Sequence, residues 1–163
     1  IGVVVVAAPL LEAGIGARLP MADDFCTAVS WCLLAAAFEM LAVWSWHVPR
    51  MHDAAGRNSV LFAFEQGSFL MAGLAVWSVA FAARSRAAAA AAAISLFFTF
   101  THMSMFGLIL TLAPRLLYDP DLCRGAFGLD RLEDQHLGGV LMAVGGGLPY
   151  LIGTAWAVSR ALR

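Results

Sequence analysis

The sequence predicts an all-α protein that crosses a membrane several times as a single bundle of helices. Hydrophobic residues make up 61% of its 163 residues and charged residues only 13%, with a mean hydropathy of +0.81. Soluble domains carry about 25% charged residues. Apolar runs of about 20 residues recur, which is the length that a helix needs to cross a bilayer. Because these runs are continuous rather than alternating, they exclude a transmembrane β-barrel.

The apolar segments define the helices that we expect, and their approximate ranges are 1–11, 26–46, 59–83, 87–113 and 137–160. The first segment is too short to cross a bilayer, so we expect four complete spans and a partial first helix, with residues missing before Ile1. The expected loops are 12–24, 47–58, the turn at 84–86, and 114–136. Pro49 favours a helix end just before it, and the seven alanines that open the fourth span favour helix and close packing.

Charge patterning predicts how the bundle is oriented and which partners it lacks. The chain contains ten arginines, no lysine and eleven acidic residues, without a basic cluster, which argues against a nucleic-acid partner. Each side of the bundle carries five arginines, but Arg84, Arg86, Arg160 and Arg163 lie directly at helix ends on one side without nearby acids. Because the positive-inside rule weighs charges close to the helix ends, it assigns that side to the cytoplasm. The loops that carry His47 and His136 then face the outer compartment. The three cysteines have no paired spacing, so we expect unpaired thiols.

Several polar residues interrupt the expected spans, and helix geometry places all of them in the outer half of the membrane. They are Glu39, Glu65, Gln66 and His102. Ionisable residues inside a membrane are costly and indicate a functional site. The alternative interpretation is that Glu39 or Glu65 only bonds a neighbouring helix. Asp134, Gln135 and His136 stand at the start of the last span, and Gly138 and Gly139 follow, with Met142 one turn further. Gly139 and Gly146 share a helix face with Met142, which predicts close packing against another helix.

Copper is the metal that these ligand types favour, because imidazole and thioether groups together suit Cu(I). His102 and Met105 are three residues apart on one expected helix, and His47 and His52 flank Pro49 in a loop. His136, with Glu65 and Gln66 as weaker candidates, completes the candidate ligand set. Haem held by two histidines is disfavoured because only His102 lies within a span. No nucleophile motif, phosphate loop or HExxH is present, so we expect no enzyme and no catalytic residue.

Separate pieces of the chain resemble one family, the Caa3-type CtaG cytochrome c oxidase assembly factors. The matching pieces are Trp46-His47-Val48-Pro49 with Asp53, Phe64-Glu65-Gln66, Gly107 to Thr111, and Asp134-Gln135 with Gly138-Gly139 and Met142. The resemblance implies a multi-pass protein of the bacterial inner membrane that takes part in maturation of the haem-copper oxidase of the respiratory chain. It also implies copper delivery to the binuclear centre of that oxidase. His47, Asp53, Glu65, Asp134 and Gln135 match positions of the family motifs.

The chain departs from the family pattern at three positions. Gln66 stands where the family has histidine, Ala143 where it has tryptophan, and His136 where it has glutamine. Two functions therefore remain open: an assembly factor that binds copper in the outer half of the membrane, and a metal-free accessory subunit of a respiratory or other membrane complex. A transporter or channel is a weaker third hypothesis.

Overall fold

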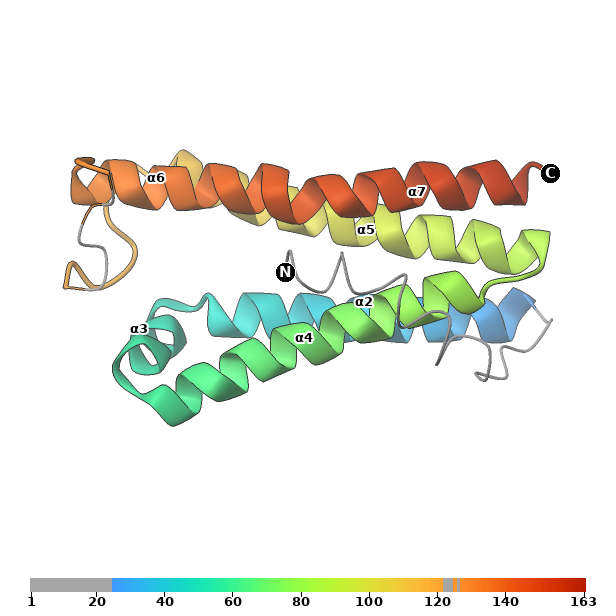
Figure 1. Cartoon of the computed structure of the whole chain (residues 1–163), viewed down its shortest axis with the longest axis horizontal. Helices are drawn as coiled ribbons and strands as arrows, with labels where there is room; N and C mark the ends of the chain where they lie inside the picture. The colour runs from blue at the N-terminus through green and yellow to red at the C-terminus, as the bar shows by residue number, and fades with distance from the viewer. Residues whose placement is uncertain (1–24, 122–124, 126) are drawn as a thin grey trace.

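The computed structural model describes residues 25–121, 125 and 127–163, and within them every regular element is a helix (Figure 1). The elements are α2 (Phe25–Trp46), α3 (Pro49–Arg57), α4 (Ser59–Ala82), α5 (Arg86–Thr111), α6 (Arg131–Leu141), the π-helical η2 (Met142–Gly146) and α7 (Gly147–Ala161). Four of the described helices are long and apolar enough to cross a membrane, with α6, η2 and α7 counted as one. The all-helical fold and its four spans are confirmed, whereas the expectations for 1–11 and 12–24 lie outside the described residues.

Residues 49–57 form a helix, so the prediction of a loop over 47–58 is wrong there. Pro49 does end α2, but it also occupies the first turn of α3, where its missing N–H costs nothing because that position has no intrahelical acceptor. Val48 between the two helices is extended. Asn58 then ends α3 and begins α4, and its side-chain oxygen accepts hydrogen bonds from the backbone N–H groups of Val60 and Leu61.

The last span begins at Arg131, six residues before the predicted start at Leu137. The cause is a capping box: the Asp130 carboxylate accepts from the N–H groups of Leu132 and Glu133, and the Glu133 side chain accepts from the N–H of Asp130. Asp134, Gln135 and His136 therefore lie on the first turns of a helix rather than in a loop.

A π-helical turn interrupts this last span at Met142–Gly146. It lies just before Pro149, which has no N–H to donate to the carbonyl of Gly145. The Ser104 hydroxyl of α5 donates to the carbonyl of Ala143 within the π-helical turn at 3.4 Å. A neighbouring helix thus satisfies a backbone group where the α-helical pattern is broken, which is how membrane proteins tolerate such breaks.

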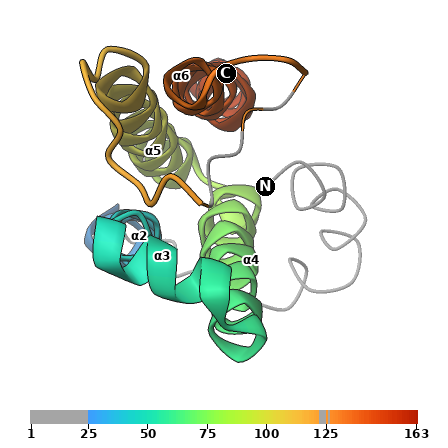
Figure 2. The ribbon, with the colours of Figure 1, turned by 90° about the vertical axis from the view of Figure 1, so that its left-hand side faces the viewer.

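Helix α5 is the centre of the bundle, since it contacts α2 and α4 on one side and α6, η2 and α7 on the other (Figures 1 and 2). Its alanine tract is largely buried against α2 and α7, which lets these helices come close. Larger side chains such as Trp77, Leu96 and Tyr150 complete this core. A second, smaller core contains Phe106, Leu110 and Tyr118, with Trp44, Leu117 and Met142 packed against it.

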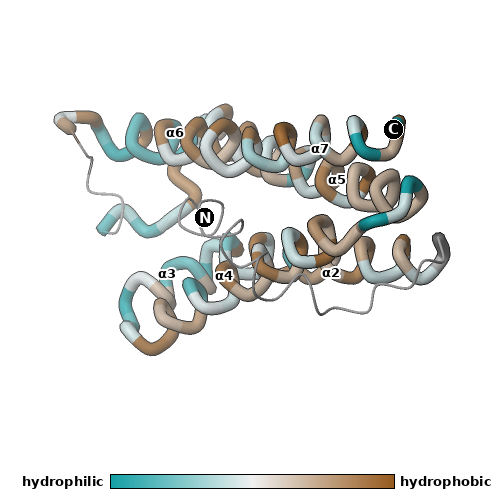
Figure 3. The backbone as a smooth tube through the Cα atoms, turned by 45° about the vertical axis from the view of Figure 1, so that its right-hand side comes forward, coloured by the Kyte–Doolittle hydropathy of each residue, from teal (hydrophilic) through white to brown (hydrophobic). Residues whose placement is uncertain are grey.

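The hydrophilic residues gather at the two ends of the bundle (Figure 3). One end, which we call the α3 end, contains α3, the segment 112–121 and the start of α6 (Figure 1). The opposite end contains the turn at Arg84–Arg86 and the end of α7. This grouping is the one that the sequence predicted, and it gathers three of the four histidines at the α3 end.

Candidate functional site

His47 occupies the junction between α2 and α3 at the α3 end. Its Nδ1 donates a hydrogen bond to the carbonyl of Val43, one turn earlier, at 2.7 Å. The ring also packs against Phe69 of α4 and Phe106 of α5, with centroid distances of 5.8 and 5.0 Å. Burial lowers the pKa of His47, the hydrogen bond to Val43 opposes this shift, and the neighbouring His52 lowers it further. The ring is therefore held neutral, with its proton on Nδ1 and a lone pair on Nε2.

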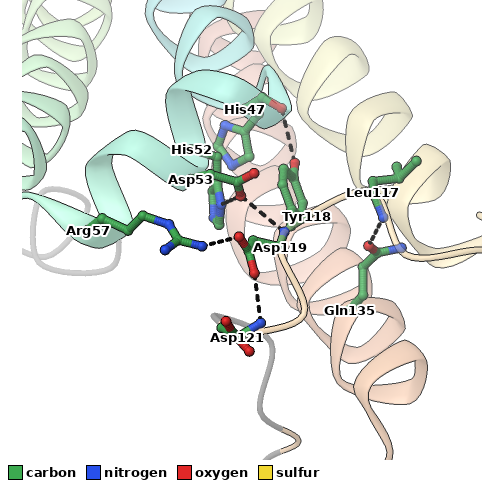
Figure 4. A network of polar contacts seen from close by, with 9 residues as sticks. All are labelled: His47, His52, Asp53, Arg57, Leu117, Tyr118, Asp119, Asp121 and Gln135. Carbon is green, nitrogen blue, oxygen red and sulfur yellow. Dashed lines mark hydrogen bonds and ion pairs between the residues drawn. The ribbon is translucent and has the colours of Figure 1, made fainter.

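His52 lies on the first turns of α3, and its ring centroid is 6.4 Å from that of His47 (Figure 4). Its ring packs against that of Tyr118 with a centroid distance of 4.1 Å and a tilt of 32° between the ring planes. Its Nδ1 is buried without a hydrogen-bond partner, 3.7 Å from a carboxylate oxygen of Asp53. A buried ring nitrogen without a partner is uncommon in proteins and indicates a place where a ligand or ion can bind.

The segment 112–121, which follows α5, is linked to the α2–α3 junction and to α3 by hydrogen bonds and an ion pair beside the rings of His47 and His52 (Figure 4). The Tyr118 hydroxyl donates to the carbonyl of His47 at 3.2 Å, and the backbone N–H of Asp119 donates to Asp53 Oδ1 at 3.1 Å. Asp119 also forms an ion pair with Arg57 at the end of α3. The N–H of Asp121 lowers the pKa of Asp119, and the Arg57 guanidinium lowers it as well.

The three polar residues at the start of α6 hold the same segment from its other side. Gln135 is buried; its Oε1 accepts from the N–H of Leu117 at 2.7 Å and its Nε2 donates to the carbonyl of Arg115 at 3.3 Å. His136 Nε2 donates to the carbonyl of Ala113 at 2.9 Å, and Asp134 accepts from the N–H of Gly125 at 3.3 Å. These contacts give the segment 113–121 a fixed position over His47 and His52.

A separate polar cluster lies inside the bundle. Glu39 of α2 accepts two hydrogen bonds, one from His102 Nε2 of α5 at 2.9 Å and one from the Tyr150 hydroxyl of α7 at 3.1 Å. All three residues are at most 3% exposed. The carboxylate is therefore satisfied on both oxygens, and the cluster ties three helices together. This geometry agrees with the interpretation that Glu39 bonds neighbouring helices.

Gly139 is the place where α6 meets α5 backbone to backbone. A Cβ atom added there would lie 2.6 Å from the carbonyl oxygen of Gly107 and 2.5 Å from the hydroxyl of Thr111. Gly146 contacts α5 through the end of the Met103 side chain, with 2.8 Å between an added Cβ and the Met103 methyl carbon, whereas a Cβ on Gly138 would meet nothing within 4 Å. The predicted close packing of Gly139 and Gly146 is confirmed, with α5 as the partner helix. Gly138, also a motif position, lies away from it.

The predicted ligand residues do not converge on one point. His102 is bonded to Glu39, while Met105 on the same helix is 45% exposed. Glu65 is buried and accepts from the Gln66 amide at 3.3 Å, and Gln66 itself is exposed. His136 is bonded to Ala113, and Met142 packs in the smaller core. Within the described part of the chain, no group of three or more histidine, cysteine or acidic side chains is arranged to hold a metal ion. The structure brings together only His47 and His52, with Asp53 beside them.

Comparison with known proteins identifies the family. The family model described as cytochrome c oxidase caa3 assembly factor (Caa3_CtaG) matches residues 3–163. The chain belongs to the cytochrome c oxidase caa3 assembly factor family. Neither a curated protein nor a solved structure matched the chain. The match confirms the resemblance drawn from the sequence motifs, and together with the four apolar spans it makes this chain a multi-pass membrane member of that family.

The structure explains three of the motif residues that the sequence resemblance singled out. Asp53, Gln135 and Asp134 accept hydrogen bonds from the backbone N–H groups of Asp119, Leu117 and Gly125, respectively, so in this family member they support the α3 end. Sequence reasoning assigned no role to Tyr118, which contacts His47 and His52, or to Tyr150, which bonds Glu39. Tyr150 lies in an apolar run of the sequence. Its role could have been inferred only from the requirement that the buried carboxylate of Glu39 accept hydrogen bonds from some donor.

Proposed function

We propose that this family member handles copper during cytochrome c oxidase assembly, with the pair His47 and His52 as its copper site. The observation that carries the proposal is the state of these two rings. His47 donates from Nδ1 to a backbone carbonyl, which is the arrangement that orients a metal-binding imidazole and directs the lone pair of Nε2 to the metal. His52 has a buried Nδ1 without a hydrogen-bond partner, and its ring lies beside that of His47.

The surroundings support a site that holds copper for transfer rather than as a permanent cofactor. Imidazole nitrogen suits copper, and the nearby carboxylate of Asp53 offsets part of the charge of a bound ion. Two imidazoles leave coordination positions open, so a receiving protein can add its own ligands while the ion is still bound. The site lies at the end of the bundle, under the segment 113–121, and a partner domain at the membrane surface reaches it without entering the bilayer.

Membership of the family supports the destination of the copper, since its members are described as cytochrome c oxidase assembly factors. The binuclear centre of a haem-copper oxidase contains copper, so a copper-handling assembly factor has a direct role in completing it. We further propose that the protein resides in the bacterial inner membrane with its α3 end in the outer compartment. Arg84, Arg86, Arg160 and Arg163, which lie directly at helix ends at the opposite end of the bundle, support this orientation, because charges close to the spans weigh most.

A second candidate function is that of a metal-free accessory subunit. It is favoured by the absence, among the described residues, of a cluster of three or more potential ligands. It is also favoured by His102 and His136, which both use Nε2 in hydrogen bonds that hold the fold together. In this alternative, the α3 end serves only as a protein-binding surface.

An experiment in cells separates the two functions. The chromosomal copy is replaced by the double variant His47→Ala and His52→Ala, with His136→Ala as the control, and the copper and haem content of the purified oxidase is measured. Copper handling predicts that the double variant yields oxidase deficient in copper and that excess copper in the medium restores it, because the ion then loads without the factor. An accessory subunit predicts that added copper restores nothing.

A further inference from the structure

The segment 112–121 is held at two places that belong to different halves of the bundle (Figure 4). Residues 113–117, which we call the base, bond Gln135 and His136 of α6. Residues 118–121, which we call the tip, bond the α2–α3 junction and α3. Gln135 is only 4% exposed, so water has little access to the hydrogen bonds that fix the base.

The tip is attached through side chains that water can reach. The Tyr118 hydroxyl donates to the carbonyl of His47, the N–H of Asp119 donates to Asp53 Oδ1, and the Asp119 carboxylate pairs with Arg57. The side chains of Asp53 and Arg57 are 28% and 56% exposed. Because hydrogen bonds and ion pairs that water reaches open at a lower free energy than buried ones, the tip should open while the base stays in place.

The closed tip restricts access to His52. The ring of Tyr118 packs against that of His52 with a centroid distance of 4.1 Å, and Nδ1 of His52 is buried. The carboxylate beside this nitrogen belongs to Asp53, to which the tip is bonded. A receiving protein therefore reaches Nδ1 of His52 only after the tip has moved.

One oxygen atom, Asp53 Oδ1, connects the tip with the imidazole of His52. It accepts the N–H of Asp119 at 3.1 Å and lies 3.7 Å from Nδ1 of His52. That second separation is too long for a hydrogen bond. Two metal–ligand bonds of about 2.0–2.2 Å, the lengths that zinc forms with nitrogen and oxygen, can span it. An ion bound at Nδ1 of His52 thus has Oδ1 within reach.

A cation that bonds Asp53 Oδ1 weakens the attachment of the tip. It draws away the negative charge that accepts the N–H of Asp119, and it repels the positive end of that N–H group. We propose that Asp53 couples the two events, so that copper binding beside His52 releases the tip and an empty site keeps it closed. This coupling rests on the proposed copper site. Because such coupling is reciprocal, displacement of the tip also strengthens copper binding by the same factor.

The consequence for transfer is that the loaded protein differs from the empty one at the surface that a partner meets. Copper-loaded protein presents an open tip and an accessible ion, whereas copper-free protein presents a closed tip. A receiving protein that docks on the open form therefore selects loaded molecules and leaves empty ones, since a partner gains only from the state that it binds better.

The test measures hydrogen exchange of single backbone amides by mass spectrometry, on the purified protein in detergent, with and without Cu(I) under a reducing atmosphere. We expect Cu(I) to speed exchange of the Asp119 amide about tenfold, because a hydrogen bond to a charged acceptor contributes at least that factor. Exchange of the Leu117 amide, which Gln135 holds, should not change. This difference between two amides of one segment separates release of the tip from general loosening.

Variants of Asp53 test the coupling atom. Asp53→Ala should speed exchange of the Asp119 amide about tenfold without copper, because its acceptor is gone. Asp53→Asn keeps an oxygen that accepts the N–H but is a poorer ligand for a cation, so the tip should stay closed when Cu(I) is added. Arg50→Ala removes another exposed side chain of α3 and should respond to Cu(I) as the unmodified protein does.

The possible failures are distinguishable. Bound Cu(I) with unchanged exchange of the Asp119 amide would overturn the coupling and leave the copper site standing. The absence of bound Cu(I) would overturn the copper site, and the coupling with it. Unchanged exchange of that amide in copper-free Asp53→Ala would overturn the attachment of the tip to Asp53, whatever the result with copper.

Discussion

Adding a single methyl group should affect the stability of the bundle differently at two adjacent glycines, Gly138 and Gly139. At Gly139 a new Cβ would lie 2.6 Å from both the carbonyl oxygen of Gly107 and the N–H nitrogen of Thr111, so the backbone of α5 must move. At Gly138 it would meet nothing within 4 Å. Gly139→Ala should therefore destabilise the protein relative to Gly138→Ala.

The pair isolates the steric cost because both variants share the same intrinsic effect. Replacing glycine by alanine inside a helix gains about 0.8–1 kcal/mol at either position. Overpacking of a close contact costs about 1–3 kcal/mol, and only Gly139→Ala incurs it. The free energies of unfolding should therefore differ by about 1–3 kcal/mol, with Gly138→Ala at or above the unmodified protein. Gly125 is unsuitable as a control because its φ of 83° and the nearby Leu129 carbonyl strain any substitution.

The assay is unfolding of both variants in the same detergent, followed by the loss of helical circular dichroism as a denaturing detergent is added. Equal free energies of unfolding for Gly138→Ala and Gly139→Ala would refute the close backbone contact between α5 and α6. It would also remove the steric explanation for glycine at that position of the family motif.

Three further results are expected. Tyr150→Phe removes one of two hydrogen bonds to the buried Glu39 carboxylate and should lower the free energy of unfolding by about 1.5–3 kcal/mol in the same assay, so an unchanged value would contradict the cluster. Gln135→Ala leaves the N–H of Leu117 without its acceptor, and limited proteolysis should then cleave the segment 113–121 faster than in the unmodified protein. Burial lowers the pKa of His47 below its ordinary value of 6.5, so the neutral ring contributes stability above pH 6.5 that is lost as the pH falls toward the lower pKa of the folded state. The melting temperature should accordingly fall more steeply with acidification in the unmodified protein than in His47→Gln, and parallel curves would contradict the buried neutral ring.

The spans were predictable from the sequence because a membrane-crossing helix must have a certain length and an apolar composition, and both are visible in the hydropathy of the sequence. The starts of α3 and α6 were predictable in principle. Pro49 is favoured in the first turn of a helix, and Asp130 with Glu133 forms a capping box. Both signals lie in polar stretches, where the spacing of apolar residues does not indicate a helix.

The candidate site was only partly predictable, because its members meet through contacts far apart along the chain. Seventy-one residues separate His47 from Tyr118, and sixty-three separate Glu39 from His102. Ligand types in the sequence pointed to His102 with Met105, whereas the structure engages His102 with Glu39 and leaves Met105 exposed. Which of several polar residues pair inside a bundle depends on helix rotation, and helix rotation here follows from glycine contacts such as that of Gly139 with α5.

The most direct test of copper handling is the affinity of the purified protein for Cu(I), measured by competition with a chromophoric chelator. We expect one high-affinity ion per chain in the unmodified protein and in His136→Ala, whose ring hydrogen-bonds the carbonyl of Ala113. We expect loss of that ion in His47→Ala and in His52→Ala. Equal Cu(I) affinity in all four proteins, or no binding by the unmodified protein, would contradict a copper site at His47 and His52.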